Sequence, residues 1–283
     1  MLLRTRKRVF KPTWPFTPAG DILQEYGVVG WWPGEPNRNL TVYDQSGHKN
    51  HGTFTGTIPA GNIWVNGKDG NKAALTYDGT TNYTNLASGI ANFNPQVTTK
   101  FSMGGWVNTT LASVGNLIAS WNFSVTNGFA FSVSGSGLPG FILTNTSGAS
   151  LYQVTSSSVV VNTGKWLYVV VTYSGGSTAN NITIYVNGIA IAVTVNFNTP
   201  PGTLTNTQIV FGKILGSVPQ FYTGLMEDWV VSNNCWTTQQ VWYLYEPKTR
   251  WQFRHQLGKR RYFVPVVAAG NRRRRVIICS GTG

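Results

Sequence analysis

Apolar residues that recur at every second position dominate the middle of this chain. Phe129, Phe131 and Val133 alternate with small residues, and this spacing is typical of a strand with one buried face. Further segments of this kind, separated by Gly, Asn, Ser and Thr, are expected at residues 101–107, 117–121, 166–172, 182–186, 189–193 and 221–231. The sequence therefore predicts an all-β sandwich or jelly roll rather than a parallel α/β sheet.

An Asn-Gly pair marks a tight turn between two of these segments. Asn187 and Gly188 lie between residues 182–186 and 189–193. A type I′ hairpin turn needs positive φ at both central residues, and Asn and Gly tolerate that conformation best. The sequence therefore predicts a β-hairpin at this point.

One short helix is expected, directly after Trp236. Thr237 can act as its N-cap with Gln240 at the third helical position, which is the spacing of a capping box. The apolar face of this helix would consist of Val241, Leu244 and Tyr245. We expect Pro247 to end the helix, because proline lacks the N–H that helical hydrogen bonding requires.

The positive charge of the chain is concentrated at its two ends. Residues 1–20 contain five basic side chains and no acid, and residues 246–283 contain ten basic side chains and one acid. Together these 58 positions carry 15 of the 22 Lys and Arg residues, which leaves seven bases and eight acids for residues 21–245. We therefore expect a basic N-terminal arm at 1–20, a nearly neutral domain at 21–246, and a basic, aromatic C-terminal arm at 247–283.

Apolar side chains are interleaved with the charges of the C-terminal arm, whereas disordered segments lack such anchors. Arms of this kind can attach a protein to a neighbour by lying along it. The residues expected to make this attachment are Arg4, Arg6, Lys7, Arg8, Lys11, Trp251, Phe253, Arg260, Arg261, Arg272, Arg273, Arg274, Arg275 and Ile277. Two alternatives stay open for the last Arg run: contact with nucleic acid phosphates, and a solvated tail.

Six short motifs follow one another in order along the central domain. They lie at residues 43–52, 70–79, 101–107, 163–173, 184–188 and 224–229, and they read YDQSGHKNHG, GNKAALTYDG, FSMGGWV, TGKWLYVVVTY, IYVNG and GLMEDW. This order resembles the concanavalin A-like jelly rolls of the laminin-G type. The resemblance covers the central domain and neither arm, and it implies a jelly-roll sandwich that closes with a short helix.

The fold alone leaves the function open, because this jelly roll serves lectins, glycan hydrolases, receptor-binding modules and virion proteins. A hydrolase needs two carboxylates that face one groove, and related glucanases place them as Glu-x-Asp-x-x-Glu on one strand. The only adjacent acids here are Glu227 and Asp228, which strict alternation puts on opposite faces. His48 and His51 fall in a turn and are interpreted as solvated loop residues. We therefore expect a protein that is not an enzyme.

Calcium is the one cofactor that the resemblance suggests. Asp44, Asp78 and Asp228 match family positions that often carry carboxylates, although Asn187 replaces a common Asp and lowers the charge of any such site. The alternative, which we favour for the first two, is that they cap turns through their own backbone. No other cofactor is expected.

Two cysteines and the loop aromatics add little to the assignment. Cys235 and Cys279 fit no disulfide framework and no zinc spacing, so unpaired thiols are favoured over a bridge. Trp64, Tyr83 and Tyr152 fall in or next to expected loops, where lectins present aromatic side chains. Most aromatic residues of a sandwich lie in its core, so the glycan-binding residues stay unassigned.

No signal peptide is expected, because the basic start of the chain is not followed by an apolar segment. No stretch is long and apolar enough for a membrane span either. A lectin-type jelly roll with basic, aromatic arms and no export signal resembles the laminin-G-like proteins encoded by tailed bacteriophages. Such proteins reach the virion without a signal peptide because they leave the cell by lysis.

The resemblance implies a non-enzymatic virion structural protein, which would be a capsid decoration protein or a head or tail fibre component. Its expected partners are other virion proteins, such as the major capsid or tail protein, further copies of itself, and a host-surface glycan. Neither a membrane nor a nucleic acid is expected as a partner. The two alternatives are a carbohydrate-binding lectin module for host attachment and a virion protein that binds nucleic acid through its Arg-rich tail.

Overall fold

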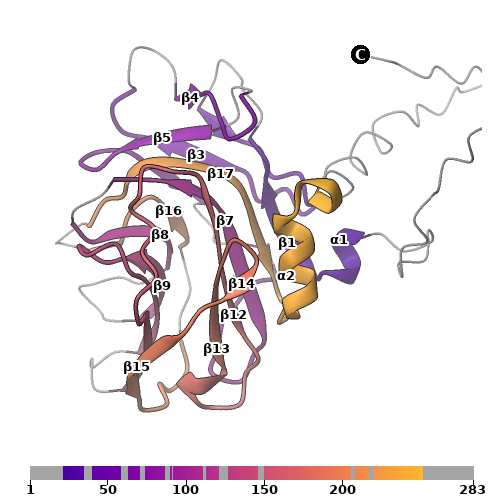
Figure 1. Cartoon of the computed structure of the whole chain (residues 1–283), viewed down its shortest axis with the longest axis vertical. Helices are drawn as coiled ribbons and strands as arrows, with labels where there is room; N and C mark the ends of the chain where they lie inside the picture. Colours follow the sequence, from indigo (N-terminus) through magenta and orange to yellow (C-terminus); the bar gives the residue numbers. More distant parts are fainter. Residues whose placement is uncertain are drawn as a thin grey trace, which may run out of the picture.

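The computed structural model forms two antiparallel β-sheets that face each other as a sandwich (Figure 1). It describes residues 22–34, 40–58, 63–70, 74–86, 90, 92–110, 113–120, 127–145, 150–204, 208–216 and 220–250. An all-β jelly roll was expected from the period-two alternation, and the two sheets confirm it. None of the described helices is long and apolar enough to cross a membrane.

The first sheet has eight strands among the described residues, in the order β14-β13-β12-β7-β17-β5-β4, with β1 also paired to β17. Their bounds are β1 Val28–Trp32, β4 Trp64–Val65, β5 Ala74–Asp78, β7 Phe101–Asn108, β12 Leu167–Tyr173, β13 Ile182–Val186, β14 Ile189–Ala190 and β17 Thr223–Ser232. Because β17 is long and pairs with β1, β5 and β7, it joins the N-terminal strand to the centre of this sheet.

The second sheet has nine strands among the described residues, in the order β15-β11-β10-β9-β8-β16-β6-β3-β2. Their bounds are β2 Thr41–Val42, β3 Gly52–Thr55, β6 Tyr83–Asn85, β8 Gly115–Ala119, β9 Gly128–Val133, β10 Pro139–Asn145, β11 Ser150–Ser156, β15 Val193–Asn198 and β16 Val210–Phe211. Hairpins connect β8 to β11 in sequence order, which is typical of antiparallel sandwiches.

The main core lies between the sheets and is rich in aromatic side chains. Phe101 of β7, Phe129 of β9 and Phe141 of β10 are each at most 1% exposed. The rings of Phe101 and Phe141 have centroids 5.5 Å apart, so the two sheets interdigitate. This packing buries the apolar face that the alternation predicted on each of these strands, although β7 is buried on its other face as well.

A second apolar cluster covers the outer face of the first sheet, beneath helix α2 Thr238–Tyr245 (Figure 1). Val241 and Leu244 of α2 pack there with Trp31 and Trp106. The predicted capping box is present, since Thr237 accepts a hydrogen bond from the Gln240 N–H and the Gln240 side chain bonds back to the N-cap. The sequence prediction of this helix is confirmed.

The predicted hairpin turn is also confirmed, because Asn187 and Gly188 have φ values of 51° and 78°. Three other predictions need correction. Residues 189–193 do not form one strand: β14 ends at Ala190, residues 191 and 192 belong to no strand, and β15 begins at Val193 and continues to Asn198. Helix α1 Ile22–Glu25 and the 3-10 helix η2 Ala179–Asn181 were not expected.

Pro247 ends α2 but does not end helical structure. Residues 247–250 are helical again, and the Arg250 N–H donates to the Glu246 carbonyl at 2.8 Å. Proline is favoured in the first turn of a helix, where its missing N–H has no partner to lose. The chain therefore continues as an ordered turn up to residue 250.

Candidate functional site

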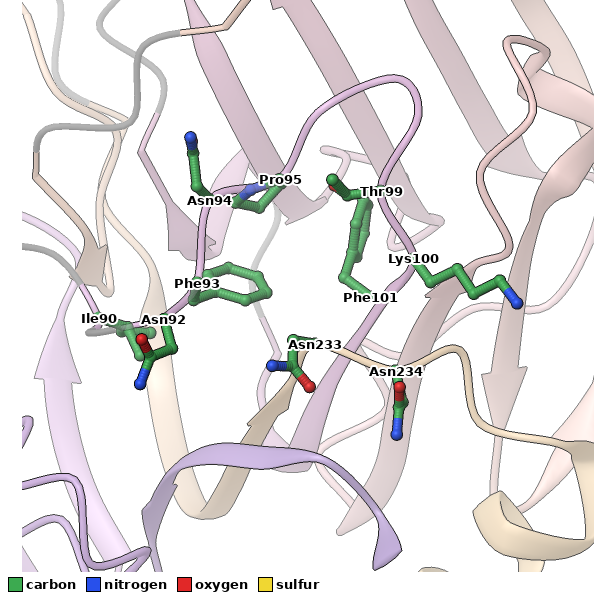
Figure 2. A pocket seen from close by; sticks show the side chains of 10 residues that line it. All are labelled: Ile90, Asn92, Phe93, Asn94, Pro95, Thr99, Lys100, Phe101, Asn233 and Asn234. Atoms are coloured by element: carbon green, nitrogen blue, oxygen red, sulfur yellow. The ribbon is translucent and has the colours of Figure 1, made fainter. Parts of the chain in front are cut away.

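A wide hollow of about 790 Å³ opens between the loop before β7 and the segment after β17 (Figure 2). Four exposed asparagines line it, together with the ammonium group of Lys100. The asparagines are Asn92 and Asn94 from the loop, and Asn233 and Asn234 from the segment after β17. Phe93 and Phe101 also line it, and its accessible surface is part polar and part apolar.

A second hollow of about 550 Å³ continues the first one. The two share Asn92, Asn233 and Asn234, and the second extends to Gln24 of α1 and to His48 in the turn after β2. We call the joined surface, from Lys100 across these three asparagines to His48, the amide groove.

Hydrogen bonds to the neighbouring strands hold the asparagine pair after β17 in place. The Ser232 hydroxyl accepts from the Asn234 N–H at 2.8 Å and donates to the Tyr26 carbonyl at 2.6 Å. The Asn234 carbonyl accepts from the Ser102 hydroxyl at 2.8 Å, and the Asn233 N–H donates to the Gly27 carbonyl at 3.1 Å. The backbone of this side of the groove is therefore fixed to the turn after α1 and to β7.

The opposite side of the groove is a tight turn with Asn92 at its tip. Asn92 has φ of 63°, a left-handed conformation that Asn adopts more readily than most residues. The Phe93 N–H donates to the Ile90 carbonyl at 3.0 Å and closes the turn. The Phe93 ring packs edge-on against Phe101 and Phe129, so the core anchors this turn.

The amide groove offers neutral hydrogen-bonding groups and positive charge, without a carboxylate. The side chains of Asn92, Asn233 and Asn234 are exposed and make no hydrogen bond to another described residue. No Asp or Glu is among the described residues that line it, and Lys100 forms no ion pair with any of them. Such a surface offers donors and acceptors to a ligand rich in hydroxyl groups.

The two adjacent acids of β17 do not lie on opposite faces, which corrects the sequence-based expectation. Glu227 pairs with Trp106 of β7 and Val230 pairs with Gly104, so Asp228 and Trp229 occupy a β-bulge. Asp228 has φ of 57°. Because the extra residue interrupts the alternation, both carboxylates reach the side of the sheet that carries Trp106.

Both carboxylates are buried and bonded there. Glu227 is 2% exposed and accepts from the Lys68 backbone N–H at 2.7 Å. The Lys68 ammonium lies 4.4 Å from the centre of the Trp106 ring. Asp228 is 6% exposed and accepts from the Trp31 indole N–H at 2.7 Å. Neither carboxylate is therefore available to a ligand in the solvent.

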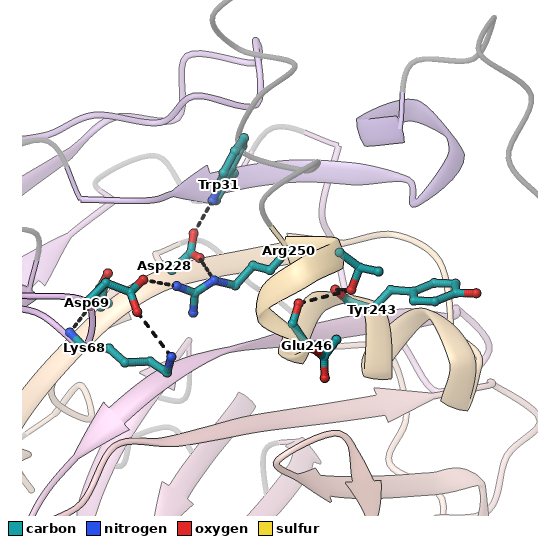
Figure 3. Close-up of polar contacts among 9 residues, drawn as sticks. Trp31, Lys68, Asp69, Asp228, Tyr243, Glu246 and Arg250 are labelled. Carbon is teal, nitrogen blue, oxygen red and sulfur yellow. Dashed lines mark hydrogen bonds and ion pairs between the residues drawn. The ribbon is translucent and has the colours of Figure 1, made fainter. Parts of the chain in front are cut away.

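Arg250 closes this buried cluster (Figure 3). Its guanidinium group lies 4.0 Å from the Asp228 carboxylate, pairs with Asp69, and stacks 5.1 Å from the centre of the Trp106 ring. The Arg250 side chain is only 7% exposed. Although the charge distribution assigns Arg250 to the C-terminal arm, its side chain is part of the packed sandwich.

The three acids expected to hold calcium have other partners. The Asp44 carboxylate accepts from the backbone N–H groups of Trp31, Ser46 and Asn50 at 2.8–2.9 Å, and Asp228 belongs to the Arg250 cluster. In the described part of the chain, no group of three or more His, Cys, Asp or Glu residues is placed to hold a metal ion.

Asp78 caps a turn, as the favoured alternative predicted. Its carboxylate accepts from the N–H groups of Thr80, Thr81 and Asn82 at 2.8–2.9 Å and from the Thr81 hydroxyl. Partial burial raises the pKa of Asp78, but these hydrogen bonds to its charged form outweigh it and hold the pKa well below its ordinary value.

The remaining sequence-based candidates divide into two groups. All fourteen expected attachment residues lie outside the described residues, as does Cys279. Cys235 is a half-buried free thiol beside the groove, and burial raises its pKa although Thr172 and Lys100 oppose the shift. His51 accepts from the Asp44 N–H at 3.0 Å, while His48 lines the groove.

Sequence reasoning did not find the groove asparagines. Asparagine is common in the loops of such a body, and only the fold brings residue 92 next to residues 233 and 234. The one usable signal was the Asn-Asn pair directly after a long apolar strand, where a loop begins.

The family described as the concanavalin A-like lectin/glucanases superfamily (Laminin_G_3) matches residues 78–242. No curated protein matches the sequence. Among solved structures, the binding domain of Paraclostridial Mosquitocidal Protein 1 is 14% identical with a TM-score of 0.57, and the alignment covers 79% of this chain and 52% of that one. The binding domain of botulinum neurotoxin DC, solved in complex with rat synaptotagmin II, is 14% identical with the same TM-score, over 77% of this chain and 51% of that one.

Domain 4 of AbnA, an extracellular arabinanase of Geobacillus stearothermophilus in complex with arabinotriose, is 21% identical with a TM-score of 0.51. The alignment covers 77% of this chain and 98% of that one. This chain spans about half the length of the toxin binding domains that it matches. At these identities the similarity concerns the fold alone.

Proposed function

This chain belongs to the concanavalin A-like lectin/glucanases superfamily, and we propose that it is a non-enzymatic, lectin-like protein that binds a carbohydrate in the amide groove. One observation carries the proposal. The exposed amides of Asn92, Asn233 and Asn234 line the same groove from two segments of the chain and have no hydrogen-bond partner among the described residues.

Amide side chains suit sugar hydroxyls because each amide offers two N–H donors and a carbonyl acceptor. A sugar diol presents neighbouring donors and acceptors that can bond to one amide at two points. The fixed backbone on both sides of the groove reduces the ordering cost of binding. Solved carbohydrate and receptor complexes of the same fold, such as the arabinotriose complex, support a binding role.

The charge of the groove favours an acidic sugar over a neutral one. Among the described residues that line it, Lys100 and His48 are the only two with ionisable side chains. A uronate or another acidic sugar could pair with the Lys100 ammonium, and this contribution should weaken as salt is added.

The absence of turnover is part of the proposal. Glycoside hydrolysis needs two carboxyl groups that reach the scissile bond. Glu227 and Asp228, the adjacent acids of β17, are 2% and 6% exposed and are bonded to Lys68, Trp31 and Arg250. The groove lining contains no carboxylate among the described residues.

Calorimetric titration with a panel of neutral and uronate-containing oligosaccharides tests this function. We expect Asn233→Ala and Asn92→Gly each to raise Kd about fivefold or more, since a lost hydrogen bond is worth about 1 kcal/mol. Glycine is used at residue 92 because it keeps the left-handed backbone without strain. Asn66→Ala, which removes an exposed amide outside the groove, should leave Kd unchanged.

Two results would contradict the proposal as a whole, and a third would contradict the role of Lys100. Absence of binding to the whole panel would remove the lectin function. Binding that Asn233→Ala and Asn92→Gly leave intact would place the carbohydrate site elsewhere on the domain. A preference for uronates that persists in Lys100→Met would remove the role given to that ammonium.

A second candidate function is attachment to a bacteriophage virion through the arms. It is supported by the charge distribution, in which residues 1–20 and 246–283 carry 15 of the 22 bases. In that setting the groove would face outward and bind a host-surface glycan. Incorporation into particles should be lost when residues 1–20 and 251–283 are deleted, and full occupancy of the truncated protein would exclude the arms as the attachment device.

The nucleic-acid alternative makes a different prediction for the same arms. Phosphate contacts release counterions, so the affinity for duplex DNA would fall steeply with salt. For each phosphate contacted, a tenfold rise in salt concentration would lower the logarithm of the binding constant by about 0.9. Apolar anchors such as Ile277 do not weaken in salt. Retention on the particle at about 1 M salt, where the Debye length is about 3 Å, would favour the protein-attachment function.

A further inference from the structure

Strand β15 is an edge strand of the second sheet that is exposed along most of its length. At its C-terminal end, the Asn198 side-chain oxygen accepts a hydrogen bond from the Ala179 N–H of η2 at 2.6 Å. Thr194 to Asn198 are all exposed, and only Val193 is half-buried. One side of β15 pairs with β11, and β15 ends the sheet order, so no described strand pairs with its other side. Figure 1 shows β15 leaving β14 and crossing from one sheet to the other.

Large apolar side chains are exposed on and beside this strand. Phe197 is 52% exposed and Val195 36%. The neighbouring Ile189 of β14 is 62% exposed, and Trp242 of α2, which packs over the turn that precedes β14, is 41% exposed. Val195 and Phe197 therefore add exposed apolar surface to a strand whose other side is unpaired among the described residues.

No charge protects the strand. The 47 residues from 166 to 212 contain no Asp, Glu, Lys, Arg or His. Natural proteins usually protect sheet edges with Lys, with Pro, or with very short edge strands. Three other edge strands of the described sheets, β2, β4 and β14, follow the last rule with two residues each, whereas β15 has six. β1, which pairs with β17 alone, has five residues, but all five are buried.

We propose that β15 pairs antiparallel with β15 of a second copy of this chain, so that the second sheet continues across a two-fold axis. In an antiparallel pair across a two-fold axis, the residues next to the axis lie near their own copies, so a charge there would face a like charge, which is destabilising. β15 and the residues around it in the sequence carry no charge, so two copies of the strand do not repel each other. A charged partner would find no opposite charge on the strand.

The register of β15 on β11 is compatible with this symmetry. Thr194 and Phe197 lie opposite Thr155 and Gln153, two half-buried residues of β11. Cross-strand partners share a face, so Thr194 and Phe197 lie on the same face of the sheet. Residues three apart in a regular strand would lie on opposite faces, but the register shift between Gln153 and Val154 inserts one extra residue into β15 and brings them to the same face. A two-fold axis between Val195 and Asn196 would set Thr194 opposite Phe197 of the second copy, on the same face of the extended sheet. Six paired residues span about 20 Å, a normal strand length.

Sedimentation equilibrium of the full chain tests the proposal. The wild type should be a dimer at about 10–100 µM, and Asn196→Lys should raise its dissociation constant about 100-fold or more, because it sets two ammonium groups beside the axis. Asn66→Lys, which adds the same charge beside β4 at an edge of the other sheet, should leave the dimer intact. Phe197→Ser should weaken the dimer without adding charge.

Hydrogen exchange and thermal unfolding separate loss of pairing from loss of folding. Amides on the free side of β15 should be protected in the wild type and exchange faster in Asn196→Lys. The Asn196 side chain accepts from the Thr155 hydroxyl at 2.9 Å, so the melting temperature of the monomeric domain should fall only by the contribution of this one exposed hydrogen bond. A wild type that is monomeric at 100 µM overturns the proposal. So does a dimer that Asn196→Lys leaves intact, because its interface must then lie elsewhere.

Discussion

The buried ion pair of Arg250 should be one of the largest single side-chain contributions to the stability of this domain. In Arg250→Met the apolar stem is kept and the guanidinium group is removed. The Asp228 carboxylate, 8% exposed in its side chain, would then keep the Trp31 indole and lose the nearby cation. Breaking a buried pair by removing one partner costs about 3–5 kcal/mol, because it leaves an uncompensated buried charge.

The lower half of that range is the better expectation for this pair. The Arg250 Nε and Asp228 oxygen are 4.0 Å apart, and Arg250 Nη1 has no hydrogen-bond partner among the described residues. Asp69, the second partner, is 45% exposed in its side chain, so solvent screens its contribution. A loss of about 3 kcal/mol would lower the melting temperature by about 6–12 °C for a domain of this size.

Thermal and urea unfolding of wild type, Arg250→Met, Asp228→Asn and the double variant measure this coupling. The double variant should be more stable than the sum of the single losses predicts, by about 1 kcal/mol or more. Lys248→Met, which removes an exposed positive charge two residues earlier, is the matched control. Our reasoning is refuted if Arg250→Met and Lys248→Met are equally stable, or if the two single losses simply add.

Three further predictions concern the turn, the helix cap and turnover. The pKa of Asp78 is lowered on folding, so its contribution to stability is complete above about pH 5 and is lost as the pH falls below about 4. The difference in unfolding free energy between wild type and Asp78→Asn should therefore be smaller at pH 2 than at pH 7. Thr237→Ala removes the capping box of α2 and should cost about 1 kcal/mol in urea unfolding, whereas Thr53→Ala on an exposed strand position should cost less. Purified protein should release no reducing ends from β-glucans, galactans or host-surface polysaccharide, and any turnover that disappears in Glu227→Gln would show that the protein is an enzyme.

Local patterns were sufficient to predict the fold because each one has a single structural solution. The alternation at Phe129, Phe131 and Val133 can bury one face only in a strand, and all three are buried. The Asn187-Gly188 pair and the Thr237 cap depend on residues close in sequence, so no tertiary information was needed. The laminin-G-type resemblance rested on the order of such local patterns, and the family match over residues 78–242 confirms it.

Features that depend on an insertion or on distant partners could not be predicted in the same way. The bulge at Asp228 shifts one residue out of alternation, and a period-two pattern assumes that no such shift occurs. The amide groove joins residue 92 to residues 233 and 234, a contact between segments about 140 positions apart. The calcium-type carboxylates match the family in sequence, yet their hydrogen bonds go to backbone N–H groups, Trp31 and Arg250, which no motif specifies.

The burial of Arg250 also changes how the charge at the C-terminal end is interpreted. Ten bases follow residue 245, but the Arg250 charge is matched by Asp228 and Asp69 inside the sandwich. Only nine of the ten can therefore meet a capsid protein or a nucleic acid. A deletion that begins at residue 247 removes the buried cation together with the arm, so loss of attachment could follow from weakened folding. A deletion that begins at residue 251 keeps the cluster intact, and only that variant attributes a loss of attachment to the arm itself.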